Sequence, residues 1–245
     1  MGNPKTAKGE GYGYLTGILH LSPAGQSLAF GGFNTCPHAT AQCAAACLNT
    51  AGRGGIPQAR TDGHSNMIQA ARVRKTVRFV RDREAFLSDL ASDIRKLSRT
   101  AAKHGLSPAV RLNGTSDLLW ERVRVTVDGR SYANIMEAFP KVRFYDYTKW
   151  PVSQRSNLPR NYSLTLSRSE ETTDESIVSA VKERRNVAVV FSTRRGQSLP
   201  KRYLGLRIID GDKTDLRFTD PKGVIVGLRA KGRAKRQDGG FVVNV

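Results

Sequence analysis

The only cysteines of the chain lie within one short segment, N-T-C-P-H-A-T-A-Q-C-A-A-A-C-L, at Cys36, Cys43 and Cys47. Three thiols cannot pair off completely as disulfides, and a closed tetrahedral metal site needs a fourth ligand. Three thiolates suit a [4Fe-4S] cluster whose fourth iron is left open to a substrate or a cofactor. We therefore expect these three cysteines to be the metal ligands of an iron–sulfur site.

Two other interpretations of the cysteine segment stay open. With His38 as a fourth ligand, the three cysteines could bind zinc, or the histidine could close the cluster site. The thiols could also be small buried side chains without any ligand, although this does not account for their clustering. An alanine-rich helix is expected at Ala41–Leu48, and it places Cys43 and Cys47 on one helix face because they are four residues apart.

Polar side chains stand at or just beyond the ends of three predicted strands, Ala109–Leu112, Val142–Tyr147 and Tyr162–Leu166. In a parallel (β/α) barrel the carboxyl ends of the strands converge on one site. We therefore expect a shared catalytic site that contains Asn113, Asp117, Asp146, Lys149, Ser167 and Arg168. The alternative for any one of these residues is that loops are polar simply because they are exposed.

The elements that must position these residues alternate between strands and helices. Helices are expected at 61–81, at 83–103, near 131–139 and after the capping box Thr172-x-x-Glu175. Further strands are expected at Tyr14–Leu21, Ser27–Phe30, Val187–Phe191, Leu206–Ile209, Val224–Leu228 and Phe241–Val245. In the first helix, Val73, Val77 and Val80 form the expected apolar stripe.

This alternation indicates βαβ units and a largely parallel sheet. We predict a single α/β domain over residues 1–245, with a partial (β/α) barrel-like core. Its expected parts are a flexible arm at 1–13, the cysteine segment at 34–57, a helical insert at 58–105 and the β/α core at 106–245.

The charge of the chain is strongly positive, with 40 Lys and Arg against 21 Asp and Glu and a net charge of +19. Such an excess favours contacts with the phosphates of DNA or RNA; solubility or an acidic protein partner is the alternative. The expected contact residues are Arg72, Arg74, Arg78, Arg229, Lys231 and Arg233. No apolar run is long enough for a membrane span and no secretory signal is recognisable, so we expect no membrane partner and a cytoplasmic location.

A three-cysteine loop ahead of a βα series resembles the radical S-adenosylmethionine enzymes. That resemblance implies a partial (β/α) barrel, a [4Fe-4S] cluster held by the three cysteines, and S-adenosylmethionine bound at the open iron. The stretch from Gly223 to Gly227 is similar to the family's G-x-I-x-G-x-x-E strand, which implies cofactor binding by Gly223, Ile225 and Gly227. The chain departs from the family in its cysteine spacing, C-x6-C-x3-C instead of C-x3-C-x2-C, and in Ala230 at the position of the Glu.

A second resemblance covers nearly the whole chain. The stretches N-T-C-P-x-A-x-x-C-x-x-x-C, R-L-N-G-T-S-D, F-Y-D-Y-T-K and D-G-D-K-T-D-L-R-F look like a tailed-phage family known as gene product 88. This implies a viral origin and a role in the infected bacterium or in the particle. Together, the observations predict an iron–sulfur phage protein that binds or modifies nucleic acid in a radical-SAM-like manner. The alternative is a non-enzymatic nucleic-acid-binding phage protein with a structural zinc or iron–sulfur site.

Overall fold

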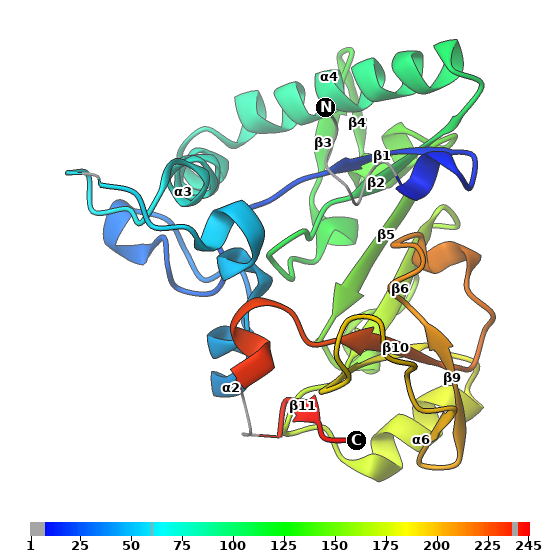
Figure 1. Ribbon diagram of the computed structural model, residues 1–245. Helices are drawn as coiled ribbons and strands as arrows, with labels where there is room; N and C mark the ends of the chain where they lie inside the picture. Colours follow the sequence, from blue (N-terminus) through cyan, green and yellow to red (C-terminus); the bar gives the residue numbers. More distant parts are fainter. Residues whose placement is uncertain (1–7, 60, 237–239) are drawn as a thin grey trace.

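A nine-stranded sheet forms the centre of the molecule (Figure 1). The computed structural model describes residues 8–59, 61–236 and 240–245. The sheet contains, in spatial order, β1 (Tyr14–Ile18), β2 (Ser107–Arg111), β5 (Arg143–Thr148), β6 (Tyr162–Ser167), β7 (Val187–Phe191), β10 (Ile225–Arg229), β9 (Leu206–Asp210) and β8 (Arg202–Tyr203), with β11 (Val242–Val243) beside β7. Only the β8–β9 pair of this described sheet is antiparallel. The expected α/β class with a mostly parallel sheet is therefore confirmed.

From β1 to β10 the parallel strands lie side by side in the order in which the chain forms them. The exceptions are β8 and β9, which lie beyond β10, and a separate hairpin of β3 (Val125–Val127) and β4 (Arg130–Tyr132). Because the neighbours are parallel, their carboxyl ends share one edge of the sheet. The loops that follow β1, β2, β5, β6 and β10 therefore all begin at the same edge.

The helices lie in the connections between the strands. They are α2 (Ala41–Ala45), α3 (Met67–Arg81), α4 (Arg83–Lys103), α5 (Ile135–Ala138) and α6 (Asp174–Lys182). The segment expected as a helical insert contains α3 and α4 and connects β1 to β2, which are parallel neighbours. Helix α4 packs against both strands and adds Phe86, Leu87 and Ile94 to the main core.

The segment after β9 crosses to the other side of the sheet. Phe218 packs edge-on against Tyr14 of β1 and Tyr145 of β5, with ring centroids 4.9 and 5.6 Å apart. In a flat sheet, six steps of about 4.8 Å each would separate β1 from β9. The segment between β9 and β10 therefore extends across one face of the sheet and packs over β1 and β5.

Two expectations about local structure are wrong. The strand expected at Ser27–Phe30 is a 3-10 helix, η1 (Leu28–Phe30), ended by Gly31 in the left-handed region at φ 80°. In α3, Val80 is 46% exposed, and the buried face consists of Ala70, Val73, Thr76 and Phe79. The valines at 73 and 80 are both apolar, but the core lies on the side of Phe79, whose large ring fixes the orientation of the helix.

The described end of the expected N-terminal arm is in contact with the sheet edge. Lys8 Nζ donates a hydrogen bond to the backbone oxygen of Asp212 (2.7 Å), while residues 1–7 lie outside the described part of the chain. Among the described residues, no helix is both long and apolar enough to cross a membrane.

Candidate functional site

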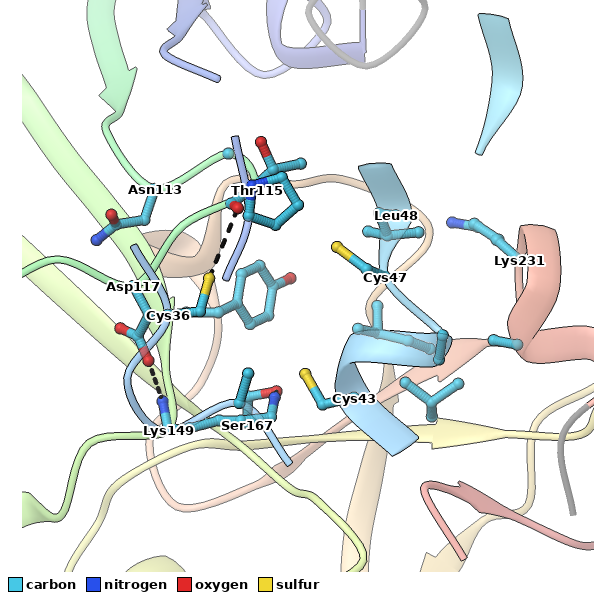
Figure 2. A pocket seen from close by; sticks show the side chains of 18 of the residues that line it. Cys36, Cys43, Cys47, Leu48, Asn113, Thr115, Asp117, Lys149, Ser167 and Lys231 are labelled. Carbon is cyan, nitrogen blue, oxygen red and sulfur yellow. Dashed lines mark hydrogen bonds between the residues drawn. The ribbon is translucent and has the colours of Figure 1, made fainter. Parts of the chain in front are cut away.

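All three cysteines line one cavity of about 270 Å³ at the carboxyl edge of the sheet (Figure 2). Cys36 lies on the loop after η1, Cys43 lies in α2, and Cys47 precedes the 3-10 helix η2 (Leu48–Thr50). None of the three forms a disulfide. The segment that follows the first strand of the sheet therefore brings three free thiols to one space.

The loop of Cys36 is fixed to the segment that follows β2. The Thr35 hydroxyl donates to the backbone oxygen of Ser22 (2.5 Å), and the Thr35 backbone oxygen accepts from the amide of Asp117 (2.8 Å). The Cys36 sulfur lies 3.7 Å from the backbone oxygen of Thr115. These bonds hold the first thiol beside the residues at the end of the second strand.

Glu170 anchors the helix that carries Cys43. Thr40 is the N-cap of α2, and its hydroxyl oxygen accepts from the amide of Cys43 (3.2 Å). The Glu170 carboxylate, just after β6, accepts from the Thr40 hydroxyl (2.8 Å) and from the amide of Gln42 (3.0 Å). Burial by itself raises the pKa of the Glu170 carboxyl, but the hydrogen bonds outweigh it and the pKa lies below its usual value.

Cys47 is held from the side of α3. Its sulfur accepts from the amide of Asn49 (3.5 Å), and the Asn49 backbone oxygen accepts from the Arg72 guanidinium (3.1 Å). Burial raises the pKa of Cys47 to about 11 and also raises the pKa of Cys36. Both side chains are thus protonated at neutral pH, and a metal ion could bind them only by displacing these protons.

The opposite wall of the cavity consists of polar residues that follow the strands. Four of the six predicted catalytic residues lie there: Asn113, Asp117, Lys149 and Ser167. Lys149 connects two strand ends, because its Nζ donates to the Ser167 hydroxyl (2.8 Å) and its amide donates to the Asp117 carboxylate (2.7 Å). In the view of Figure 2, Lys149 and Ser167 lie below Cys36 and to the left of Cys43.

Asp146 does not line the cavity but orients a residue that does. It is fully buried and accepts from the amide of Asn113 (2.7 Å) and from the Tyr162 hydroxyl (2.9 Å). Desolvation raises the pKa of Asp146 to about 7. The Asn113 side-chain oxygen in turn accepts from the Trp120 indole (3.1 Å), so the side chain is held in one orientation.

Arg168 also lies outside the cavity lining. Its guanidinium donates to the backbone oxygens of Gly240 and Phe241 (2.6 and 3.2 Å). Phe241 covers the cavity from the C-terminal segment, with the Lys149 ammonium 5.4 Å from its ring centroid. Arg168 therefore holds the segment that forms one wall.

The six residues expected to be catalytic do not include several residues that line the cavity. The buried Arg111 pairs with Asp215 (3.2 Å), and its guanidinium lies 4.8 Å from the ring centroid of Tyr147. The strand-end rule that found Asn113 also applies to Arg111 and Asp215. Lys8 and Phe241 carry no such signal, because they reach the cavity from the two ends of the described chain.

The three residues expected to bind a cofactor lie along β10 and away from the cavity lining. Gly223 and Ile225 are at the amino end of the strand, whereas Leu228 and Arg229 line the cavity at its carboxyl end. A Cβ placed on Gly227 would lie 2.7 Å from a methyl group of Ile208, so that position faces apolar side chains of β9.

His38 turns toward Trp150 and does not line the cavity. The two rings pack edge-on with centroids 4.2 Å apart, and the Trp150 indole donates to the Asp117 backbone oxygen (2.8 Å). Within the part of the chain that the structure describes, no three His, Cys, Asp or Glu side chains are close enough to hold a single metal ion.

The family model described as Gene product 88 matches residues 1–244. The chain belongs to this family. The match confirms the resemblance to this tailed-phage family that the cysteine segment and the strand motifs indicate. No curated protein and no solved structure matches the chain.

The basic residues expected to contact nucleic acid divide into two groups in this family member. Arg72, Arg229 and Lys231 are engaged within the protein: Arg72 with Asn49, Arg229 with Asp210 and Asp212 (3.0 and 3.1 Å), and Lys231 with Asp212. Arg78 pairs with Asp89 on the surface (2.7 Å). Arg74 and Arg233 are exposed on α3 and on the 3-10 helix η7 (Gly232–Arg236).

Proposed function

We propose that the protein is an iron–sulfur protein that binds or modifies nucleic acid in the cytoplasm of the infected bacterium. The observation that carries this proposal is that three free thiols share one cavity with the polar ends of the parallel strands. A metal staple needs only its ligands, whereas a site for chemistry also needs converging acids, bases and hydrogen-bond donors. The convergence of Asn113, Asp117, Lys149 and Ser167 on the thiols favours the enzyme over the non-enzymatic alternative.

The donor set fits a [4Fe-4S] cluster. Each iron of such a cluster takes one thiolate, so the thiols surround a cavity instead of meeting at one point. The side chain of His38 packs on Trp150, which favours a fourth iron without a protein ligand over a closed site. A bound cluster would supply electrons to a ligand at that iron.

The radical-SAM-like form of this function is supported by the topology. The cysteine segment follows β1, and six parallel strands lie side by side in chain order. We propose on this ground that the core is a partial (β/α) barrel and that S-adenosylmethionine is the ligand of the open iron. Ala230 stands where the radical S-adenosylmethionine enzymes have Glu, and here it belongs to a small buried apolar cluster with Ala46, the C-cap of α2. In this chain, the cofactor contact that the family's Glu makes would therefore have to come from another residue.

The metal is tested on protein purified without oxygen. We expect several irons and sulfides per chain, and loss of both in the single variants Cys36→Ala, Cys43→Ala and Cys47→Ala. Ser167→Ala is the matched control, because it removes a polar group from the same cavity without removing a thiol. Stoichiometric zinc without iron would replace the proposed cluster by a structural zinc site.

The open iron is tested by EPR on the reduced protein. Addition of S-adenosylmethionine should shift the cluster signal, and release of 5′-deoxyadenosine would identify a radical enzyme. The His38→Ala variant is the control, since its ring packs on Trp150 and its loss should change neither iron content nor the response. An unchanged spectrum in both proteins would leave the cluster as a structural or electron-transfer group.

A further inference from the structure

A pair of stacked rings lies on the surface beside the cysteine segment. Phe30, at the end of η1, stacks on His64 with ring centroids 4.2 Å apart and planes inclined by 30°. Phe30 is 36% exposed. In Figure 1 the segment that contains η1 is blue and the loop that leads into α3 is cyan. The rings thus come from segments before and after the cysteines and meet at the surface.

Two arginines of α3 accompany the ring pair. Arg81 reaches the residue next to Phe30, since a Cβ on Gly31 would lie 2.6 Å from Arg81 Nη2. Arg74 stands on the same face of the helix, about two turns earlier, and both arginines are exposed. Arg78 lies between them and pairs with Asp89. The surface therefore combines exposed aromatic area with positive charge on one side.

A single nucleic-acid strand is the ligand that uses both features. Unpaired bases present flat faces that stack on aromatic rings, while the phosphates between them attract guanidinium groups. In a duplex the base faces are already stacked on one another. An acidic protein segment would use the arginines and leave the rings without a partner.

We propose that Phe30 and His64 form a base-stacking platform for single-stranded nucleic acid, with Arg74 and Arg81 on its phosphates. The inference deepens the nucleic-acid part of the proposed function and rests on it, because it names the form of the partner and the place where it binds. Gln26, which lies four residues before Phe30, lines the cavity. Leu48, which follows Cys47, lines it as well. A strand on the platform would therefore lie near the cavity.

The platform is tested with the full chain and a short mixed-sequence oligonucleotide that carries 2-aminopurine, whose fluorescence falls when the base stacks. Phe30→Ala and His64→Ala should each weaken binding by about five- to tenfold and reduce the quenching, whereas Phe30→Trp should preserve both. Tyr132→Ala is the matched control, because Tyr132 is an aromatic residue with an arginine beside it, Arg130 at 5.2 Å from its ring centroid, but lies on the β3–β4 hairpin. Iron content and melting temperature are measured for every variant.

The possible results distinguish failure of the platform from failure of the proposed function. Wild-type binding with unchanged affinity and quenching in Phe30→Ala overturns the platform and leaves the proposed function intact. Absence of wild-type binding at low salt overturns the platform and the nucleic-acid part of the function together, while the iron content stands by itself. Equal competition by duplex, or a wild-type dimer in light scattering that Phe30→Ala dissociates, would also overturn the platform.

Discussion

At the scale of single residues, the candidate site is maintained by side chains behind it. Glu170 bonds the first turn of α2, and Asp146 bonds the Asn113 amide from beneath the cavity. Neither residue reaches the thiols, yet each determines where a lining residue stands. Both carboxylates are therefore positioning groups.

The buried Asp146 should make stability depend on pH in a particular direction. Its folded-state pKa is about 7 against 3.8 for an ordinary Asp, so the folded protein keeps the proton over a range in which the unfolded chain loses it. Its contribution is complete below about pH 4 and is lost as the pH rises to about 7, at about 1.4 kcal/mol per pH unit. Asp146→Asn cannot ionise, so its free energy of unfolding should improve relative to the wild type over this range.

Urea denaturation at a series of pH values checks this expectation. Asp93→Asn, at an exposed position on α4, is the control and should follow the wild type more closely. Parallel curves for Asp146→Asn and the wild type would show that Asp146 does not carry the proton.

At the scale of elements, the predictions from the sequence succeed where an apolar pattern is long or continuous. Helix α4 was expected at 83–103 and lies at Arg83–Lys103, because its apolar residues recur with helical period over about four turns. Strand β7 was expected at Val187–Phe191 as an unbroken apolar run and has those bounds. Leu28–Phe30 is too short a run to distinguish a strand from a turn of helix.

The β3–β4 hairpin was missed although its turn left a signal. Asp128 and Gly129 both have positive φ, 53° and 73°, as a two-residue hairpin turn requires. The clustering of the thiols and several strand-end residues could be expected from spacing and topology. The burial of Asp146 could not, because a strand covered on both faces gives no alternation that separates inside from outside.

The orientation of α3 gives a direct test of which face is buried. Val73 is 6% exposed and Val80 is 46% exposed, so Val73→Ala should cost about 2 kcal/mol of unfolding free energy and Val80→Ala less than about 0.5 kcal/mol. The two variants remove the same atoms from the same helix, which makes each the control of the other. Equal losses in thermal or urea denaturation would mean that the helix is rotated toward Val80.

At the scale of the whole molecule, the net charge of +19 does not translate into equal contributions from all basic residues. Arg229 is held between Asp210 and Asp212, where it offsets carboxylates of the protein. Arg233 lies exposed on η7. Exposed residues such as Arg233, which are not paired with carboxylates in the described part of the chain, are therefore the ones expected to attract a polyanion.

The salt dependence of nucleic-acid binding should separate these two kinds of arginine. A plot of log K against log salt concentration has a negative slope, and each lost phosphate contact makes this slope shallower by about 0.7 to 0.9. Arg233→Gln should therefore flatten the slope, whereas Arg229→Gln should leave the slope unchanged and lower the melting temperature. Titrations at several salt concentrations decide between them, and a flatter slope for Arg229→Gln would contradict the role of its ion pairs.

The walls of the cavity run from Lys8 to Phe241 along the chain, and this has a consequence for biosynthesis. While the ribosome is still elongating the chain, the thiols emerge early but the strands that face them do not yet exist. Phe241, which Arg168 holds against the cavity, leaves the exit tunnel long after the cysteines. Under the proposed function, iron delivered before Phe241 has been made would meet an open and oxidisable segment, so assembly of the metal centre is expected to follow synthesis of that residue.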